Sequence, residues 1–290
     1  MNDTLKAAVW MSGAIVSFTS MAIAGRAVSL ELDTFEIMMY RSMVGIVLVV
    51  GVAGAAGTLG QVNRNNIGLH FVRNLSHFAG QNLWFYAITV IPLAQVFALE
   101  FTSPIWAILL SPLILGEKLR PIGLLAALIG FFGILLVARP NPQTLDFGQV
   151  AAAGAAVGFA LSALFTRKLT RSQSITCILF YLTVMQAALG ILFAGFDGDI
   201  AVPSVASLPW IVLIACAGLV AHYCLTTALR LAPASVVMPI DFIRLPLIAV
   251  VGMTLYAEQI DLWVLVGAAV IFAGNYLNIL SQLRLKPAPK

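Results

Sequence analysis

Charged side chains are scarce in this sequence, and their scarcity determines the class of protein. Only 10% of the 290 residues are Asp, Glu, Lys or Arg, whereas 61% are hydrophobic. Soluble domains carry about 25% charged residues, so this chain lacks the charge that a water-facing surface requires. A soluble enzyme, a nucleic-acid-binding protein and a disordered chain are therefore excluded, and a polytopic membrane protein is predicted.

Cysteine is also rare. Cys177, Cys216 and Cys224 all lie within apolar runs, where a lone thiol packs like a small hydrophobic side chain. Their spacing matches neither a metal site nor a disulfide framework. The chain also lacks a glycine-rich phosphate loop, a His-x-x-x-His pair and paired acids on one helix. We therefore expect no metal, no cofactor and no enzymatic activity.

The apolar runs are long enough to cross a membrane repeatedly. A bilayer core of about 30 Å requires about 20 apolar residues per helix. By this measure ten spans are predicted, at residues 7–26, 35–56, 69–90, 93–115, 121–138, 148–167, 174–195, 207–229, 234–256 and 262–282. The fold class is thus an all-α membrane protein with ten transmembrane helices.

The distribution of lysine and arginine predicts the orientation. If the N-terminus is cytoplasmic, the outer loops hold only Arg26 and Arg139. The inner side then holds Lys6, Arg64, Lys118, Arg120, Arg167, Lys168, Arg171, Arg230, Arg284, Lys286 and Lys290. Cytoplasmic loops retain positive charge, so we expect a protein of the cytoplasmic (inner) membrane with both termini in the cytoplasm.

The chain contains an internal repeat. A shift of 141 residues places Arg26 on Arg167, Pro92 on Pro233, and Glu100 on Asp241. The same register aligns Glu117 with Glu258. Residues 1–141 and 142–290 are therefore interpreted as two five-helix repeats. Since five is odd, the second copy must be inverted relative to the first, an arrangement typical of secondary transporters with a binding site near the midplane.

Five ionisable residues lie well within predicted spans: Arg41, Arg73, Glu100, Asp241 and Arg244. A charge at the membrane centre costs about 2.5–3.5 kcal/mol on the insertion scale, so these side chains should face a cavity or pair with one another. Asp241 and Arg244 are three residues apart and can meet on one helical face.

These residues suggest a binding site for a metabolite. Arginine grips carboxylates and phosphates through two hydrogen bonds, so Arg41 and Arg244 are predicted to anchor an anionic or zwitterionic substrate. The third span carries a polar stripe, which consists of Arg73, His77, Gln81 and Trp84. This stripe, together with Tyr40 and Asp241, completes the predicted set of substrate-binding residues.

Glu100 is predicted to couple transport to protons. The sequence places no basic residue within four positions of it, so burial should favour its neutral form and make it the proton carrier.

Other interpretations of the same residues stay open. Asp241 and Arg244 could be a purely structural pair, Arg73 could reach lipid headgroups from the cytoplasmic end, and His222 could be a packing residue. Both acids could also serve only to neutralise arginines, in which case the protein is a uniporter or an exchanger.

Several motifs resemble one known family. The run Trp84-Phe85-Tyr86-Ala87 followed by Ile91-Pro92-Leu93-Ala94 resembles the third-to-fourth helix junction of the drug/metabolite transporter superfamily, in its ten-helix EamA-type branch. Leu115-Gly116-Glu117-Lys118-Leu119 is similar to a later motif of those proteins. The resemblance covers nearly the whole chain. It implies two inverted five-helix repeats, a central cavity lined by the first four helices of each repeat, and transport of small organic metabolites without ATP.

The predicted function is therefore secondary active transport, as an exporter or exchanger working by alternating access. An uncoupled facilitative carrier is the main alternative, and a membrane-embedded enzyme or a scaffold subunit is a more distant one. The expected partners are a small-molecule metabolite and the lipid bilayer, with a homodimer left open and no nucleic acid.

Overall fold

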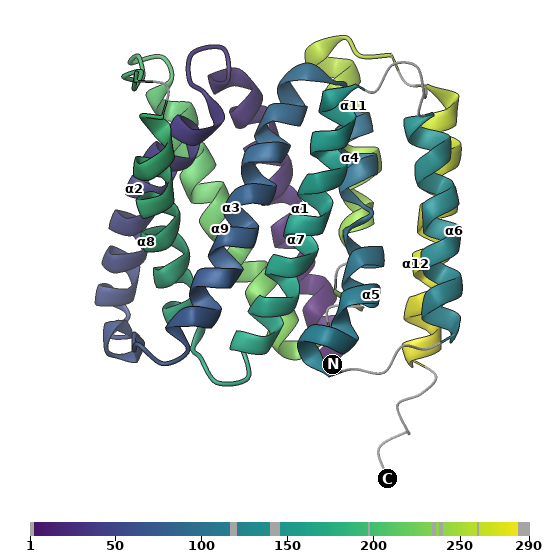
Figure 1. Ribbon diagram of the computed structural model, residues 1–290, viewed down its shortest axis with the longest axis horizontal. Coiled ribbons are helices and arrows are strands. Elements are labelled where there is room, and N and C mark those ends of the chain that lie inside the picture. The colour runs from purple at the N-terminus through teal and green to yellow at the C-terminus, as the bar shows by residue number, and fades with distance from the viewer. Residues whose placement is uncertain are drawn as a thin grey trace.

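The computed structural model describes residues 3–116, 121–139, 146–196, 198–233, 236–237, 240–259 and 261–283. Within them the chain forms helices joined by short connections (Figure 1). The elements of the first half are α1 (Asp3–Val28), α2 (Thr34–Ala55), η1 (Leu59–Gln61), α3 (Ile67–Val90), α4 (Leu93–Glu100), α5 (Ser103–Leu115) and α6 (Pro121–Ala138). Those of the second half are α7 (Phe147–Leu169), α8 (Ile175–Ala194), α9 (Leu208–Leu231), η2 (Asp241–Ile243), α11 (Arg244–Tyr256) and α12 (Leu262–Leu283).

The ten-helix membrane fold predicted from the sequence is confirmed. The fourth predicted span is made by α4 and α5 together, and η2 and α11 lie within the ninth. Some residues used in the predictions lie outside the described ones: Glu117, Lys118, Arg120, Arg284, Lys286, Lys290 and the boundary between residues 141 and 142.

Local sequence signals determine where several helices begin and end. Asp33 and Glu36 form a capping box at the start of α2, with each side chain accepting a hydrogen bond from the other residue's backbone N–H. Ser174 accepts from the backbone N–H of Cys177 at the start of α8. Gly116 ends α5 with a φ of 69°, a left-handed conformation that glycine adopts at little cost.

The helix pairs follow the internal repeat. In the described part of the chain α1 packs along α9 and α3 along α7, while α2 pairs with α8 and α6 with α12. The 141-residue shift maps α1 onto α7 and α3 onto α9. The repeat therefore relates the α1–α9 pair to the α3–α7 pair. The last two pairs map onto themselves. This pattern is the one that two inverted copies related by a pseudo-twofold axis produce.

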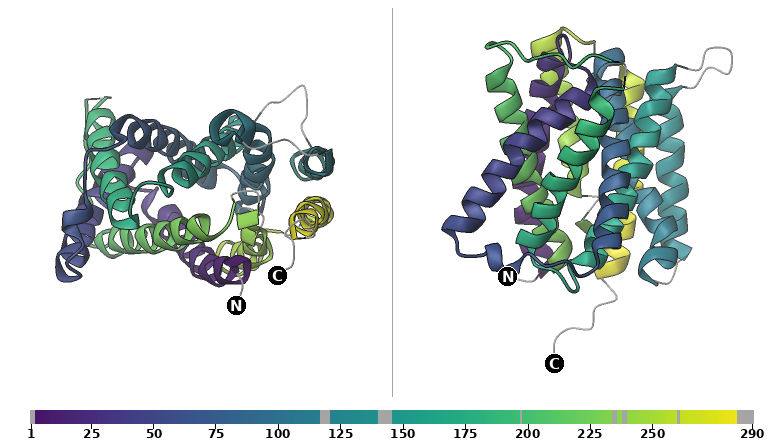
Figure 2. Two further views of the ribbon diagram at one scale, coloured as in Figure 1. Left: turned by 90° about the horizontal axis from the view of Figure 1, so that it is seen from below. Right: turned by 60° about the vertical axis from the view of Figure 1, so that its left-hand side comes forward.

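Glycines in matching positions allow close packing at the outlying α6–α12 pair, which stands at one side of the bundle (Figure 2). A Cβ on Gly133 would lie 2.7 Å from the carbonyl oxygen of Gly267, and one on Gly274 would lie 2.8 Å from that of Ala126. Gly133 and Gly274 are themselves 141 residues apart. Both copies therefore use the same small-residue contact.

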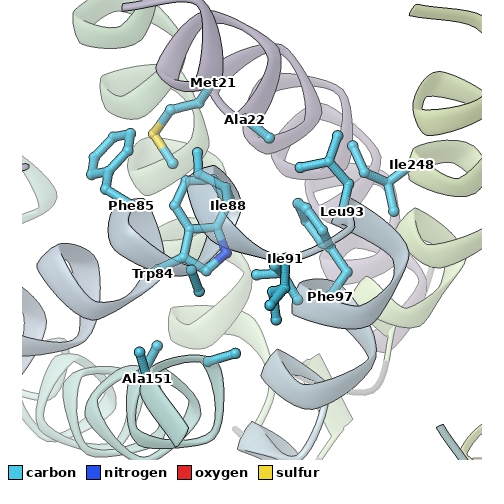
Figure 3. Packing of buried hydrophobic residues seen from close by; sticks show 14 of the residues in the cluster. Met21, Ala22, Trp84, Phe85, Ile88, Ile91, Leu93, Phe97, Ala151 and Ile248 are labelled. Carbon is cyan, nitrogen blue, oxygen red and sulfur yellow. The ribbon is translucent and has the colours of Figure 1, made fainter. Parts of the chain in front are cut away.

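The start of α1 and the end of α12 lie at the same end of the bundle, here called the terminal face, and the other end is the opposite face (Figure 1). The α3–α4 junction at Ile91 and Pro92 lies at the opposite face, and α4 runs from there to the middle of the bundle. Buried apolar side chains pack beneath this junction, here called the outer seal (Figure 3): Met21, Ala22, Phe85, Ile88, Ile91, Leu93, Phe97 and Ile248.

Candidate binding cavity

A cavity lies between the two repeats, at the breaks in the helices. Its volume is about 70 Å³, which is room for several water molecules. It reaches from the middle of the bundle toward the terminal face, since Met11, Arg73, Thr166 and Thr226 line it in the terminal halves of their helices. The other lining residues used below are Phe18, His77, Gln81, Trp84, Glu100, Phe101, Phe159, Ser162, His222, Asp241 and Arg244.

Three charged side chains meet at one end of the cavity. Arg244 Nη2 lies 2.6 Å from Glu100 Oε1 and 2.5 Å from Asp241 Oδ2. The indole N–H of Trp84 donates to Glu100 Oε2 at 2.7 Å. Here called the acidic triad, Glu100, Asp241 and Arg244 together carry a formal charge of −1, because two carboxylates share one guanidinium.

Aromatic rings surround this guanidinium. The Arg244 Cζ atom lies 4.7 Å from the ring centre of Phe97, 5.0 Å from that of Phe18 and 5.6 Å from that of Phe101. These distances are in the range of cation–π interactions. The cation is thus held by two acids and several ring faces, which leaves its Nε as an unpartnered donor.

The structure contradicts one premise of the sequence interpretation. Glu100 was expected to lack a basic neighbour because none is close to it in the sequence, yet Arg244 reaches it from 144 residues away. The break between α4 and α5 and the start of α11 bring these residues together from different repeats. Sequence spacing within one helix cannot show such a contact.

Two imidazoles face each other further along the cavity. The rings of His77 and His222 are 4.7 Å apart between centroids, at 82° to each other. Nε2 of His77, both ring nitrogens of His222, Nε2 of Gln81 and Oγ1 of Thr226 are buried without a hydrogen-bond partner. Since buried polar groups in proteins are nearly always satisfied, these atoms are available to a bound molecule or to water.

Arg73 lies beyond the histidines and is only 2% exposed. Its Nε donates to Thr166 Oγ1 at 3.1 Å and its Nη1 to Asn74 Oδ1 at 3.0 Å. Gln186 Nε2 in turn donates to the carbonyl oxygen of Asn74 at 2.8 Å. Arg73 therefore points into the protein rather than toward lipid headgroups, and the partners found for it among the described residues are neutral.

Two predicted site residues lie away from the cavity. The hydroxyl of Tyr40 donates to the carbonyl oxygen of Ala201, in the connection between α8 and α9, at 2.9 Å. Arg41 lines a small separate chamber, which is described below. His77, Gln81, Trp84, Arg73 and the acidic triad are the predicted residues that the fold brings together.

Sequence reasoning missed the contribution of α7. Ser162 and Thr166 of this helix line the cavity, as does Phe159. Small hydroxyl groups in an alanine-rich run resemble ordinary helix-packing residues, so little in the sequence distinguishes them. The shared helical face of Phe159, Ser162 and Thr166 is the signal that could have identified them.

Comparisons with known proteins agree with this arrangement. The model of the EamA-like transporter family matches the chain twice, at residues 5–139 and 146–280. A riboflavin transporter of Brucella anthropi is 30% identical over 245 residues, covering 82% of this chain and 85% of that protein. An S-adenosylmethionine uptake transporter of Rickettsia felis is 22% identical, covering 97% of this chain and 96% of that protein.

A solved crystal structure to which this chain is similar has the same fold. It superposes with a TM-score of 0.72 at 18% sequence identity, covering 97% of this chain and 99% of the other. The same family model matches each half of this multi-pass membrane chain, in agreement with the inverted repeat. The chain belongs to the EamA-like transporter family, within the drug/metabolite transporter superfamily.

Proposed function

We propose that this chain is a secondary transporter that moves a small polar organic metabolite across the cytoplasmic membrane by alternating access. The observation that carries the proposal is the cavity itself, which lies between inverted repeats and contains several buried polar atoms without partners. A cavity at the repeat interface is where secondary transporters bind their substrates. The positive-inside rule supports a cytoplasmic location for the terminal face.

The arrangement of charge favours a zwitterionic or strongly dipolar substrate. The acidic triad has a surplus negative charge at the middle of the membrane, and Arg73 carries a positive charge near the terminal face. Arg244 is already neutralised by two acids, so Arg73 replaces it as the anchor for an anionic group. A cationic or hydrogen-bond-donating group would lie near Asp241, whose Oδ1 has no partner.

The lining also suits a planar heteroaromatic ring. Phe18, Trp84 and Phe159 offer ring faces, and His77 and Gln81 offer hydrogen-bonding atoms. Such a ring stacks through its faces and forms hydrogen bonds along its edge. Riboflavin and S-adenosylmethionine, named for the relatives, both contain such a ring, and the second also carries an ammonium, a carboxylate and a sulfonium group. They are therefore the first two substrates to test. Sites for such molecules measure about 300–1,000 Å³, so either substrate would bind only when the helices around this cavity of about 70 Å³ move apart.

Alternating access requires that the closed side can open. The outer seal closes the cavity at the opposite face, and a polar cluster holds this closure near Ile91. Arg26 forms an ion pair with Glu258 and donates to the carbonyl oxygen of Ile91 at 3.4 Å. The Glu258 carboxylate also accepts from the backbone N–H of Leu93 at 3.1 Å. Breaking this cluster would free the α3–α4 hairpin from α1 and α11.

We assign proton coupling to the acidic triad rather than to Glu100 alone. With a formal charge of −1, the triad can take up one proton and become neutral without leaving Arg244 unpaired. The alternative is a facilitative carrier in which the two acids only hold Arg244. A proton gradient distinguishes the two, because only the coupled transporter responds to it.

The test of transport is counterflow in proteoliposomes that contain the purified chain. Vesicles are loaded with unlabelled riboflavin or S-adenosylmethionine, and uptake of the same radiolabelled compound is followed in separate experiments. A carrier shows a transient, saturable overshoot. Arg73→Ala should abolish the overshoot for a substrate with an anionic group, and Arg73→Lys should weaken it at least tenfold, because lysine cannot form the paired hydrogen bonds of a guanidinium.

The matched control is Arg64→Ala, which removes an exposed arginine from the loop before α3. It should retain wild-type counterflow. Absence of counterflow for both compounds would reject both substrates, and a folded Arg73→Ala protein with normal counterflow would reject the anchor.

A further inference from the structure

A second, smaller chamber lies beside the main cavity, between α2, α8 and α9. Its volume is about 10 Å³, close to the space that one water molecule needs. Its wall includes Arg41, Gln186, Gly218 and His222. His222 also lines the main cavity, so one imidazole separates the two spaces.

Arg41 brings a positive charge into this chamber. Its side chain is buried in the middle of α2, with 6% of the residue exposed. The hydrogen-bond partner found for its Nη1 is the sulfur of Met21, at 3.6 Å, which is a weak acceptor. Among the residues that the structure describes, no carboxylate forms an ion pair with Arg41. A guanidinium buried in a membrane requires a compensating charge.

A second donor faces the same space. Both ring nitrogens of His222 are buried without a partner, and a neutral imidazole always carries one N–H. The side-chain amide nitrogen of Gln186 is already bonded to Asn74, whereas its oxygen has no partner. The hydrogen-bond donors that an anion needs are therefore those of Arg41 and His222. The unpartnered oxygen of Gln186 would repel an anion, so an anion would bind on the side of the chamber next to Arg41 and His222.

We propose that this chamber binds a small monovalent inorganic anion, for which chloride is the natural candidate, between Arg41 and His222. The guanidinium supplies the charge and the imidazole N–H a hydrogen bond. A carboxylate-bearing metabolite or a phosphate needs several times the volume of a water molecule. Chloride is a single atom only somewhat larger than water, so it requires the least displacement of the chamber walls. The anion would also fix the orientation of His222, and through it one wall of the main cavity.

Gly218 keeps this space open. It lies one helical turn before His222, and a Cβ added to it would be 3.6 Å from Arg41 Nη1 and 3.7 Å from Met21 Sδ. These are ordinary van der Waals distances, so alanine at this position is compatible with the fold. The added methyl group would nevertheless occupy part of the space in front of the guanidinium.

Thermal unfolding of the detergent-purified chain tests the proposal without any transported substrate. The Tm is measured in sodium chloride and in sodium gluconate at equal ionic strength, over a series of chloride concentrations. A ligand that binds the folded state raises Tm with its concentration. We expect a saturable rise in Tm with chloride. Sulfate, which is larger and divalent, should give no saturable rise, only the gradual stabilisation that its exclusion from protein surfaces produces.

Arg41→Gln should abolish the response to chloride, whereas the control Arg64→Gln, which removes an exposed loop arginine, should keep it. Because loss of Arg41 can itself impair folding, Gly218→Ala provides a second test and should weaken the apparent chloride affinity at least tenfold. An equal Tm in chloride and gluconate would overturn the proposal. So would an undiminished chloride response in either Arg41→Gln or Gly218→Ala.

Discussion

Arg244 Nη2 lies 2.6 Å from Glu100 Oε1, and this contact joins the breaks in two helices that belong to different repeats. Glu100 is the last residue of α4 and Arg244 is the first of α11. At the first break Ser103 Oγ donates to the carbonyl oxygen of Glu100 at 2.6 Å, which satisfies a backbone group that the interrupted helix leaves free. The contact that shapes the binding cavity therefore also holds the two halves of the fold together.

Removal of Arg244 should destabilise the protein strongly. Arg244→Met leaves Glu100 and Asp241 as uncompensated buried acids, and breaking a buried ion pair on one side costs about 3–5 kcal/mol. The triple variant Arg244→Met/Glu100→Gln/Asp241→Asn removes the charges together and should recover much of that loss. The midpoint of chemical denaturation in detergent measures both effects.

Arg230→Met, at an exposed arginine near the end of α9, is the control and should change the midpoint little. A single Arg244→Met variant as stable as the wild type would show that the two acids do not depend on this guanidinium.

The sequence predicted the fold well because length and hydropathy determine membrane spans directly. The inverted repeat followed from matched positions such as Pro92 and Pro233, and the structure repeats the match in Gly133 and Gly274.

The site was predicted less completely. The stripe of Arg73, His77, Gln81 and Trp84 follows helical periodicity on one helix, so the sequence contains it. The pairing of Glu100 with Arg244 depends on how two distant helices cross, and Arg41 turns away from the main cavity for the same reason. Helical periodicity shows which face of a helix points into the protein. It does not show which of two neighbouring cavities the side chains on that face line.

A methyl group at the α3–α7 crossing should destabilise the fold. A Cβ on Gly158 would lie 2.8 Å from the carbonyl oxygen of Ser76 and from Cα of Gly80. Both are backbone atoms, so the helices must separate, and overpacking of this kind costs about 1–3 kcal/mol. Gly158→Ala should lower the Tm, whereas Gly68→Ala should not, because nothing lies within 4 Å of a Cβ there. Equal Tm values for the two variants would contradict the close crossing.

Weakening the Arg26–Glu258 ion pair should open the opposite face more often. Glu258→Gln replaces the charged acceptor of Arg26 with a neutral amide and weakens the bond to the backbone N–H of Leu93. The reporter is Ala22→Cys, a fully buried position in the outer seal, in a background whose three natural cysteines are replaced by serine.

The rate at which a membrane-impermeant thiol reagent labels this cysteine from the opposite face should rise at least severalfold in Glu258→Gln. Asp3→Asn, which removes an exposed acid at the terminal face, serves as the control. An unchanged labelling rate in Glu258→Gln would mean that the apolar seal alone keeps this side closed.

The loop between α1 and α2 should separate from the α8–α9 connection at acidic pH. Hydrogen bonds from the hydroxyl of Ser207, then from the backbone and hydroxyl of Ser204, lower the pKa of the Glu31 carboxyl. A lowered pKa in the folded state means that this contact is fully present at neutral pH and is lost as pH falls through that pKa.

Hydrogen exchange at the Ser204 amide, corrected for intrinsic rates, should therefore accelerate only as pH falls below about 4.3, the usual pKa of a glutamate carboxyl. In the Glu31→Gln variant, the corrected exchange rate of the Ser204 amide should stay the same from neutral to acidic pH. A wild-type rate that is equally flat would show that Glu31 does not hold the connection.

Replacement of Glu100 by glutamine should uncouple transport from protons. Two carboxylates share the Arg244 guanidinium, so the triad can alternate between charges of −1 and 0. In Glu100→Gln the remaining Asp241 and Arg244 form a neutral pair, and uptake of a proton would leave Arg244 without an acid. The variant should therefore exchange substrate in counterflow yet lose the acceleration that an imposed pH gradient gives the wild type.

Uptake in proteoliposomes with and without that gradient separates the possibilities. The Arg64→Gln control should respond to the gradient as the wild type does, since its side chain is exposed in the loop before α3. A wild type that ignores the gradient identifies a facilitative carrier, in which Glu100 and Asp241 serve to hold Arg244 across the two repeats. A Glu100→Gln variant that still responds would place the proton on a group outside the triad, and His77 and His222, the buried imidazoles that line the same cavity, would then be the next to replace.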